Sequence, residues 1–175
     1  MFPVHGCGLS GSISVAACRT DTNRSKKTGN MMADIIKTLQ NNAFGIFSSY
    51  PVLFAYAYGS MVSGTAHRFS DLDIGIYLRP DCLGNALETE LNLSLDIDRQ
   101  LGHVIETEVR AVNTLPITFV GRILTEGVLL YSADESRRVA FEVLLRKKYF
   151  DFLPIIRNHR RAYIESAKQE RNNHG

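Results

Sequence analysis

The spacing of apolar residues changes several times along the chain, and each spacing predicts a different element. Between residues 32 and 47 apolar side chains recur every three or four positions, which predicts an amphipathic helix. Residues 52–58 are almost all apolar, as in a strand that is covered on both faces. In residues 71–78 and 103–112 apolar and polar side chains alternate, which predicts two further strands.

Helical spacing returns after the second strand. We expect a helix over residues 82–101 that has Gly102 as its C-cap and a row of leucines along one side, namely Leu83, Leu87, Leu91 and Leu95. A second helix is expected over residues 117–126, where Gly127 follows. A short edge strand over residues 128–131 then completes the predicted sheet.

The C-terminal part of the chain is predicted to be helical. Ser132 and Glu135 have the spacing of a capping box, which opens a helix that runs to Phe150. Pro154 then starts or kinks a last helix that ends near residue 168. Together the elements predict an α/β fold, in which helices flank a small mixed β-sheet and a helical C-terminal extension follows.

We divide the chain into three parts. Residues 1–30 lack periodicity and are rich in Gly, Ser, Thr and Asn, so we expect them to be disordered. Met31 and Met32 open the first convincing helix, so translation could begin there and the leading segment could be an annotation artefact. Residues 31–132 form the expected α/β core, and residues 133–175 are expected to form helices packed on that core with a frayed end.

The net charge of +2 is divided unevenly along the chain. Residues 31–136 carry six basic and thirteen acidic side chains, whereas residues 137–175 carry ten basic and four acidic ones. The basic tail is either a solvated helix face or a contact for triphosphate or an acidic partner. Direct binding of nucleic acid is disfavoured, because stacking aromatics do not alternate with the basic residues. The candidate contacts are Arg137, Arg138, Arg146, Lys147 and Lys148.

Composition points to a cytoplasmic protein. Apolar residues make up 45% of the chain, but they form no run of the roughly 18 residues that would span a membrane. The three cysteines have no CxxC spacing, so neither a zinc site nor a disulfide framework is indicated.

Residue types that suit phosphate and metal binding gather between the first two strands. They are Gly59, Ser60, Gly64, Ser70, Asp71 and Asp73. A strand has a side-chain period of two, so the two aspartates point to the same side. Carboxylates this close repel each other, and Mg²⁺ is a natural partner because it prefers oxygen ligands. The Gly-Ser turn offers backbone N–H groups and a hydroxyl to a phosphate.

Gly59-Ser60, ten further residues and then Asp71-x-Asp73 resemble the signature of the polymerase-beta-like nucleotidyltransferase superfamily. The short chain is most similar to its minimal (MNT) branch, over about residues 32–163. The resemblance implies that ATP is the donor and that Mg²⁺, as two ions, is bound by Asp71 and Asp73. It also implies that Gly59 and Ser60 hold phosphates, that Gly64 lets the loop approach the nucleotide and that Ser70 orders the loop.

The superfamily uses a third carboxylate, as a metal ligand and as a base for the acceptor hydroxyl. Matching Thr107–Pro116 to the family pattern places Glu108 where an aspartate is usual. Arg110 shares the expected strand face and could instead pair with Glu108, and Glu106 is the alternative carboxylate. The loop also lacks the arginines that often follow Gly-Ser, so Arg68 becomes the candidate phosphate contact in that loop.

Proteins of the MNT branch are commonly encoded beside a HEPN-domain toxin. The resemblance therefore implies an antitoxin that transfers AMP from ATP to a tyrosine hydroxyl of such a partner. Two alternatives stay open. The protein could act by binding its partner without catalysis, or it could transfer AMP to a small molecule such as an aminoglycoside.

Overall fold

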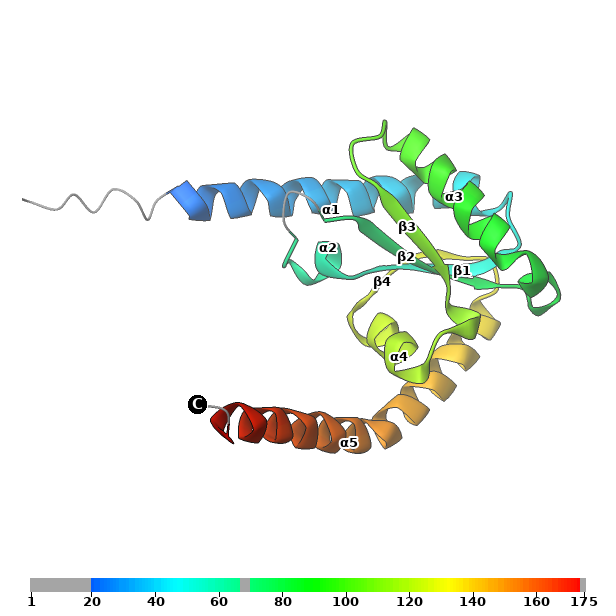
Figure 1. The fold of residues 1–175 in the computed structure, drawn as a ribbon. Helices are drawn as coiled ribbons and strands as arrows, with labels where there is room; N and C mark the ends of the chain where they lie inside the picture. The colour runs from blue at the N-terminus through cyan, green and yellow to red at the C-terminus, as the bar shows by residue number, and fades with distance from the viewer. Residues whose placement is uncertain (1–19, 67–69, 174–175) are drawn as a thin grey trace, which may run out of the picture.

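The computed structural model describes residues 20–66 and 70–173 (Figure 1). Four strands form one mixed sheet in the order β3-β2-β1-β4, in which only β2 and β3 are parallel. The predicted α/β fold is confirmed, and β4 lies at the edge as expected. In chain order the elements are α1 (Thr20–Phe47), β1 (Val52–Tyr58), α2 (Ser60–Ser63), β2 (Leu72–Leu78), η1 (Pro80–Asn85), α3 (Ala86–Gln100), β3 (Thr107–Ala111), η2 (Val112–Thr114), α4 (Ile117–Glu126), β4 (Val128–Ser132) and α5 (Glu135–Asn173).

Each face of the sheet has its own hydrophobic core. On one face, α1 and α3 pack on alternate residues of the two central strands, such as Ala55 and Ile74. On the other face, α4 and α5 pack on the intervening residues, including Phe54 and Tyr56. Figure 1 shows the two pairs of helices on opposite sides of the sheet. The prediction that β1 is covered on both faces is therefore confirmed.

The first helix is longer than its apolar pattern predicts. It begins at Thr20 rather than near Met32, so residues 20–30, which were expected to be disordered, are helical. Helix formation is cooperative, so a packed segment can carry a helix beyond its amphipathic part. Residues 1–19, the rest of the segment expected to be disordered, lie outside the described residues.

Three leucines of α3 share one side as predicted, but that side is exposed. Thr89, Leu93 and Ile97 form the buried side. Leu93 and Ile97 pack in the core on this side, and two polar residues of α3 also form hydrogen bonds with the backbone of β3. Glu90 accepts a hydrogen bond from the Ala111 N–H, and Ser94 donates one to a β3 carbonyl. The exposed leucines are Leu87, Leu91 and Leu95.

The C-terminal part differs from the prediction in two ways. It forms one helix of 39 residues with Pro154 inside it, rather than two helices. The helix accommodates the proline by curving, as Figure 1 shows. Its N-cap is Asp134 rather than Ser132, because the Asp134 carboxylate accepts a hydrogen bond from the Arg137 N–H. Within residues 20–66 and 70–173, no helix, including α5, is both long and apolar enough to cross a membrane.

The first half of α5 packs on α4. The ring of Tyr149 lies so close to Gly121 that a Cβ there would be 2.2 Å from it. Three of the five basic residues considered above are used inside this half of the helix. Arg137 pairs with Asp134, and Arg138 and Arg146 pair with Glu142.

Candidate active site

Three neighbouring strands bring together the residues of the candidate site. Tyr58, the last residue of β1, lies opposite Asp73 in the antiparallel pair of β1 and β2. Asp73 in turn lies opposite Glu108 in the parallel pair of β2 and β3. Residues opposite each other in adjacent strands share a face of the sheet, so the three side chains form one row. This row lies on the face that α4 and α5 cover.

The Gly-Ser turn lies directly against Asp73. Gly59 has a φ of 78° and a ψ of −157°, a backbone conformation that is essentially restricted to glycine. A Cβ on Gly59 would lie 2.0 Å from Asp73 Oδ2, so a side chain there would displace the carboxylate. Ser60 begins the short helix α2, which ends at Gly64 in a left-handed conformation. Ser60 therefore directly follows the glycine that lies against the aspartate.

Negative charge accumulates around Asp73. The pKa of its carboxyl is raised above its ordinary value, first by burial and then by the charges of Glu108 and Asp71, while Arg110 opposes the rise. Asp71 lies just before β2 and is exposed, yet its charge still reaches Asp73. Burial, Asp73 and Glu108 also raise the pKa of the Tyr58 hydroxyl to about 12, so this hydroxyl stays protonated at neutral pH.

Arg110 pairs with Glu108, as the sequence suggested it could. Its Nε donates a hydrogen bond of 2.7 Å to Glu108 Oε1, and Nη2 donates to the same oxygen. Both side chains are about half exposed. The pair neutralises one of the three carboxylates and leaves Asp71 and Asp73 as the carboxylates with no ion-pair partner in the described part of the site.

The two aspartates suit a divalent cation. A carboxylate whose pKa is raised by neighbouring carboxylates is relieved by a positive ion, and oxygen ligands suit Mg²⁺. No three described His, Cys, Asp or Glu side chains are arranged as a complete metal site. The Arg110 pair engages Glu108, so the fit rests on Asp71 and Asp73, with Glu108 as a ligand only after it leaves the arginine.

The other predicted site residues have different surroundings. Ser60 is half-buried, and its hydroxyl forms no hydrogen bond with any described residue. Ser70 directly precedes Asp71. Glu106 is exposed just before β3 and contributes a backbone carbonyl to Leu72. Arg68 lies outside the described residues.

Tyr58 packs in the core and also borders the candidate site. It is buried and its ring meets the edge of Phe119 from α4, at a centroid distance of 5.6 Å. It is also the neighbour of Asp73 across the sheet. The apolar pattern of β1 does not reveal this, because the register between two strands is set by their pairing.

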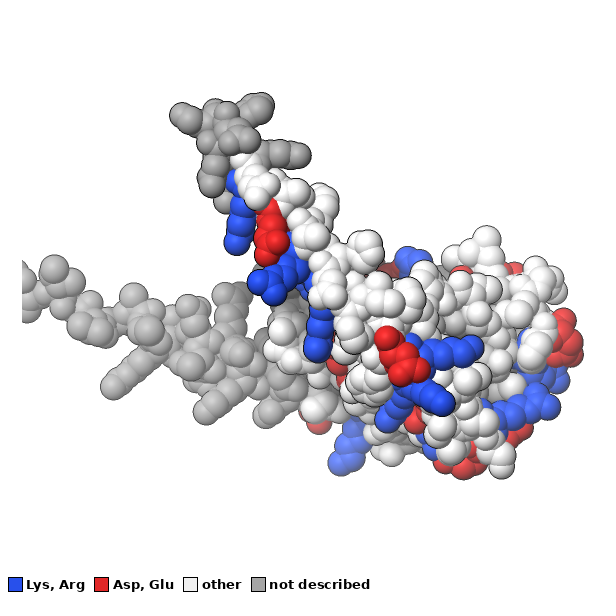
Figure 2. Space-filling view, turned by 90° about the horizontal axis from the view of Figure 1, so that it is seen from below, with Lys and Arg blue, Asp and Glu red and all other residues white. Residues whose placement is uncertain are grey.

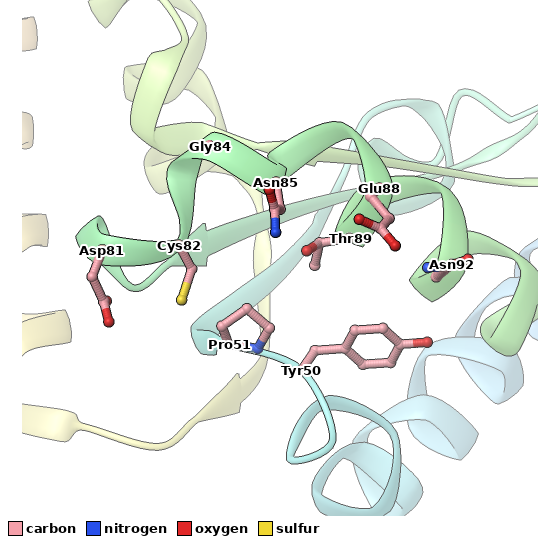
Figure 3. A pocket seen from close by; sticks show the side chains of 9 residues that line it. All are labelled: Tyr50, Pro51, Asp81, Cys82, Gly84, Asn85, Glu88, Thr89 and Asn92. Atoms are coloured by element: carbon pink, nitrogen blue, oxygen red, sulfur yellow. The ribbon is translucent and has the colours of Figure 1, made fainter.

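A separate hollow of about 360 Å³ lies at the other end of the sheet (Figure 3). Tyr50 and Pro51 line it before β1 begins, and Asp81 and Cys82 line it after β2 ends. None of the predicted site residues lines it. The hollow is therefore distinct from the candidate active site.

A family model described as polymerase beta, nucleotidyltransferase matches residues 34–136. The matched region is more than half of the chain and contains the Gly-Ser turn, both aspartates and Glu108. The chain belongs to the polymerase beta nucleotidyltransferase family. Family membership confirms the resemblance that the Gly-Ser and Asp-x-Asp spacing indicated. Comparison with curated protein sequences gives no match.

Solved structures of MNT antitoxins share the fold of this family member. One is a toxin–antitoxin complex with AMP-PNP, at a TM-score of 0.54 and 19% identity, and the match covers 74% of this chain and 98% of that one. Another is a tri-AMPylated Shewanella oneidensis HEPN toxin in complex with an MNT antitoxin, at a TM-score of 0.52 and 16% identity. That match covers 76% of this chain and 98% of the other. At these identities the likeness establishes the shared fold.

The raised pKa of Asp73 predicts a pH-dependent stability effect. Above the raised pKa the folded protein holds an ionised carboxylate that it disfavours, so stability is lost as the pH rises through that value. Asp73→Asn should therefore raise the melting temperature by a few degrees at neutral pH, a small effect because water screens a half-buried group. The gain should vanish near pH 3, where the unfolded chain also holds a protonated aspartate. Thermal unfolding of both proteins across this pH range measures the effect, and an equal gain at both pH values would contradict it.

Proposed function

We propose that this protein is a metal-dependent nucleotidyltransferase that transfers AMP from ATP to a hydroxyl group, namely a tyrosine of a HEPN-domain toxin. The contact between Gly59 and Asp73 carries the proposal. It places a turn able to hold phosphates against an aspartate that is flanked by further carboxylates. Family membership supplies the reaction class, and the acceptor is inferred from the toxin complexes described above.

In the proposed reaction the acceptor hydroxyl oxygen attacks the α-phosphorus of ATP, and the bond to pyrophosphate breaks. Asp71 and Asp73 would hold Mg²⁺, which stabilises the charge that develops on the attacking and leaving oxygens. Ser60 and the backbone of its turn would bind the terminal phosphates. Glu108 would accept the hydroxyl proton once it is released from Arg110.

The ion pair between Arg110 and Glu108 also supports a second function, which is binding of the partner without catalysis. A Glu108 that stays bound to Arg110 cannot serve as a ligand or base, and such a protein would restrain its partner by contact alone. The absence of arginines directly after Ser60 points the same way, because Met61, Val62 and Ser63 occupy those positions. Transfer to a small molecule has no comparable support, since no observation identifies a site for such an acceptor.

The mass of the intact partner protein separates the two functions. The chain is co-expressed with a HEPN-domain protein as the candidate partner, and the mass of the intact partner is then measured by mass spectrometry. A gain of one or more AMP units establishes the transfer, the donor fragment and the acceptor protein together. An unchanged mass, with the partner still bound and inhibited, would establish the binding function instead.

Glu108 and Glu106 can be compared as the third carboxylate. Glu108→Gln should lower the rate of AMP transfer roughly 100-fold, because a proton-accepting group in the transition state typically contributes that much or more. Glu106→Gln removes an equal charge two residues away and should change the rate less than about threefold. The measurement is the initial rate at saturating ATP. Equal losses in the two variants would mean that Glu108 acts only through the local charge.

A further inference from the structure

The second half of α5 extends beyond the body of the protein. We call residues 150–169 the arm. Within it only Leu153 and Ile156 are half-buried, and every other side chain is exposed. Figure 2 shows the arm projecting from the body, with basic side chains along it. Helices in proteins gain most of their stability from packing an apolar face, so the arm lacks this source of stability unless another surface covers it.

The arm continues the apolar line that packs the first half of α5 on the core. Leu145 belongs to the second core, and Tyr149 packs on Gly121. Steps of three and four residues then lead along the same side of the helix to Phe152 and Ile156. Tyr163 lies seven residues further, with a side chain that is 75% exposed. In the arm the described residues leave this line largely uncovered, because Phe152 and Tyr163 are exposed and Ile156 is only half-buried.

The charge of the arm indicates what kind of surface would be complementary to it. The arm carries four basic residues and two acidic ones. Arg161 pairs with Glu165, whereas Arg157 and Arg160 form no ion pair with any described residue. Arg160 occupies the place in the apolar line between Ile156 and Tyr163. A complementary surface therefore has an apolar row and carboxylates beside it.

A second copy of this chain fits the arm poorly. Pairing one arm with another would bring two basic surfaces together, which like charges disfavour. The exposed leucines of α3 lie among acidic residues and would attract the arm of another copy. However, α3 and α5 pack on opposite faces of the sheet, so this contact is head-to-tail and would build an open chain of molecules unless it closed into a ring. A different protein is the better occupant.

The direction of the arm links it to the candidate active site. In Figure 1 the arm points toward the end of the sheet at which α2 lies, and α2 carries Ser60. A protein bound along the arm would therefore lie on the side of the molecule where nucleotide transfer is proposed to occur.

We propose that the arm is the docking surface for the acceptor protein, and that it binds a helix whose apolar face is flanked by carboxylates. This inference rests on the proposed function for the identity of the acceptor. The row formed by Phe152, Ile156 and Tyr163 supplies the apolar contact. Arg157 and Arg160 supply the charge that selects an acidic partner and orients it.

A pair of matched double variants tests the arm. Ile156→Glu with Tyr163→Glu places two carboxylates on the apolar row of the arm, and should raise the Kd for the purified HEPN-domain acceptor at least 100-fold. Leu87→Glu with Leu91→Glu places two carboxylates on the exposed side of α3 and should leave the Kd within threefold. Isothermal titration calorimetry measures both, and unchanged melting temperatures confirm that both variants fold. The proposal would be overturned if both variants weakened acceptor binding equally or if neither weakened it.

Two further readouts separate this inference from the proposed function. If the arm variant also has a raised KM for the acceptor protein while its affinity for ATP is unchanged, the arm acts in docking. If the acceptor binds the arm but receives no AMP from the wild-type protein, the docking surface stands and the proposed reaction fails. If AMP transfer continues with an unchanged KM in the arm variant, the reaction stands and the docking surface fails. Light scattering measures the oligomeric state of the wild-type chain and of the arm variant without the acceptor. A wild-type dimer and a monomeric arm variant would assign the arm to self-association and overturn the proposal.

Discussion

Replacing Asp71 and Asp73 together by asparagine should reduce AMP transfer by roughly 1000-fold or more. Carboxylates that hold Mg²⁺ contribute several kcal/mol to charge stabilisation in the transition state, and each 1.36 kcal/mol changes the rate about tenfold. Asparagine preserves the size of both side chains, so the fold should persist. The measurement is the single-turnover rate at saturating ATP and Mg²⁺, with the acceptor protein in excess.

Asp81→Asn is the matched control for this double variant. Asp81 is an exposed aspartate after the other end of β2, beside the hollow rather than the candidate site. Its replacement should leave the transfer rate within about twofold of the wild-type value. A double asparagine variant that retains more than a tenth of the wild-type rate would place the catalytic carboxylates elsewhere in the chain.

Gly59→Ala should both destabilise the fold and disable the site. The backbone conformation at this position costs any other residue roughly 1–3 kcal/mol. In addition, the new Cβ would lie 2.0 Å from Asp73 Oδ2, so the carboxylate must move. A displacement of about 1 Å in a catalytic group can cost roughly 100-fold in rate, which is the loss we expect at saturating ATP. Chemical denaturation and the transfer rate together measure the two effects.

Gly64→Ala separates backbone strain from the contact with Asp73. Gly64 also has a positive φ, of 74°, but a Cβ there would meet nothing within 4 Å. Its replacement should destabilise the protein by roughly 1–2 kcal/mol and leave Asp73 in place. The rate of AMP transfer should then stay within about tenfold of the wild-type value. Equal activity losses in the two variants would mean that strain in the turn, rather than displacement of Asp73, limits the reaction.

These variants also bear on how the site is assembled. The Asp73 carboxylate is held where burial and two other carboxylates disfavour its charge. Groups that bind a ligand commonly reduce the stability of the ligand-free protein in this way. The expected stabilisation by Asp73→Asn and the expected loss of activity in the double variant are therefore two results of one arrangement of charge.

The sequence alone determined the elements and the chemical character of the site. The strand over residues 52–58 and the helix over residues 117–126 follow from local apolar patterns, and the structure places both at the predicted residues. The Gly-Ser turn and the Asp-x-Asp motif are also local, since a turn and a strand period depend on neighbouring residues. For the same reason the spacing of these motifs was enough to indicate the family.

Tertiary structure alone decided which of these residues meet. The row of Tyr58, Asp73 and Glu108 depends on the register of three strands, and the approach of Gly59 to Asp73 depends on how β1 and β2 pair. The packing of α3 on the sheet decided which of its sides is buried, and this is the side of Leu93 and Ile97 rather than that of the regularly spaced leucines. Periodicity likewise predicted helix in the C-terminal part, but not that Pro154 lies inside one continuous helix whose arm leaves the core. A local pattern fixes which side chains share a face, whereas the contacts of that face depend on residues far away in the chain.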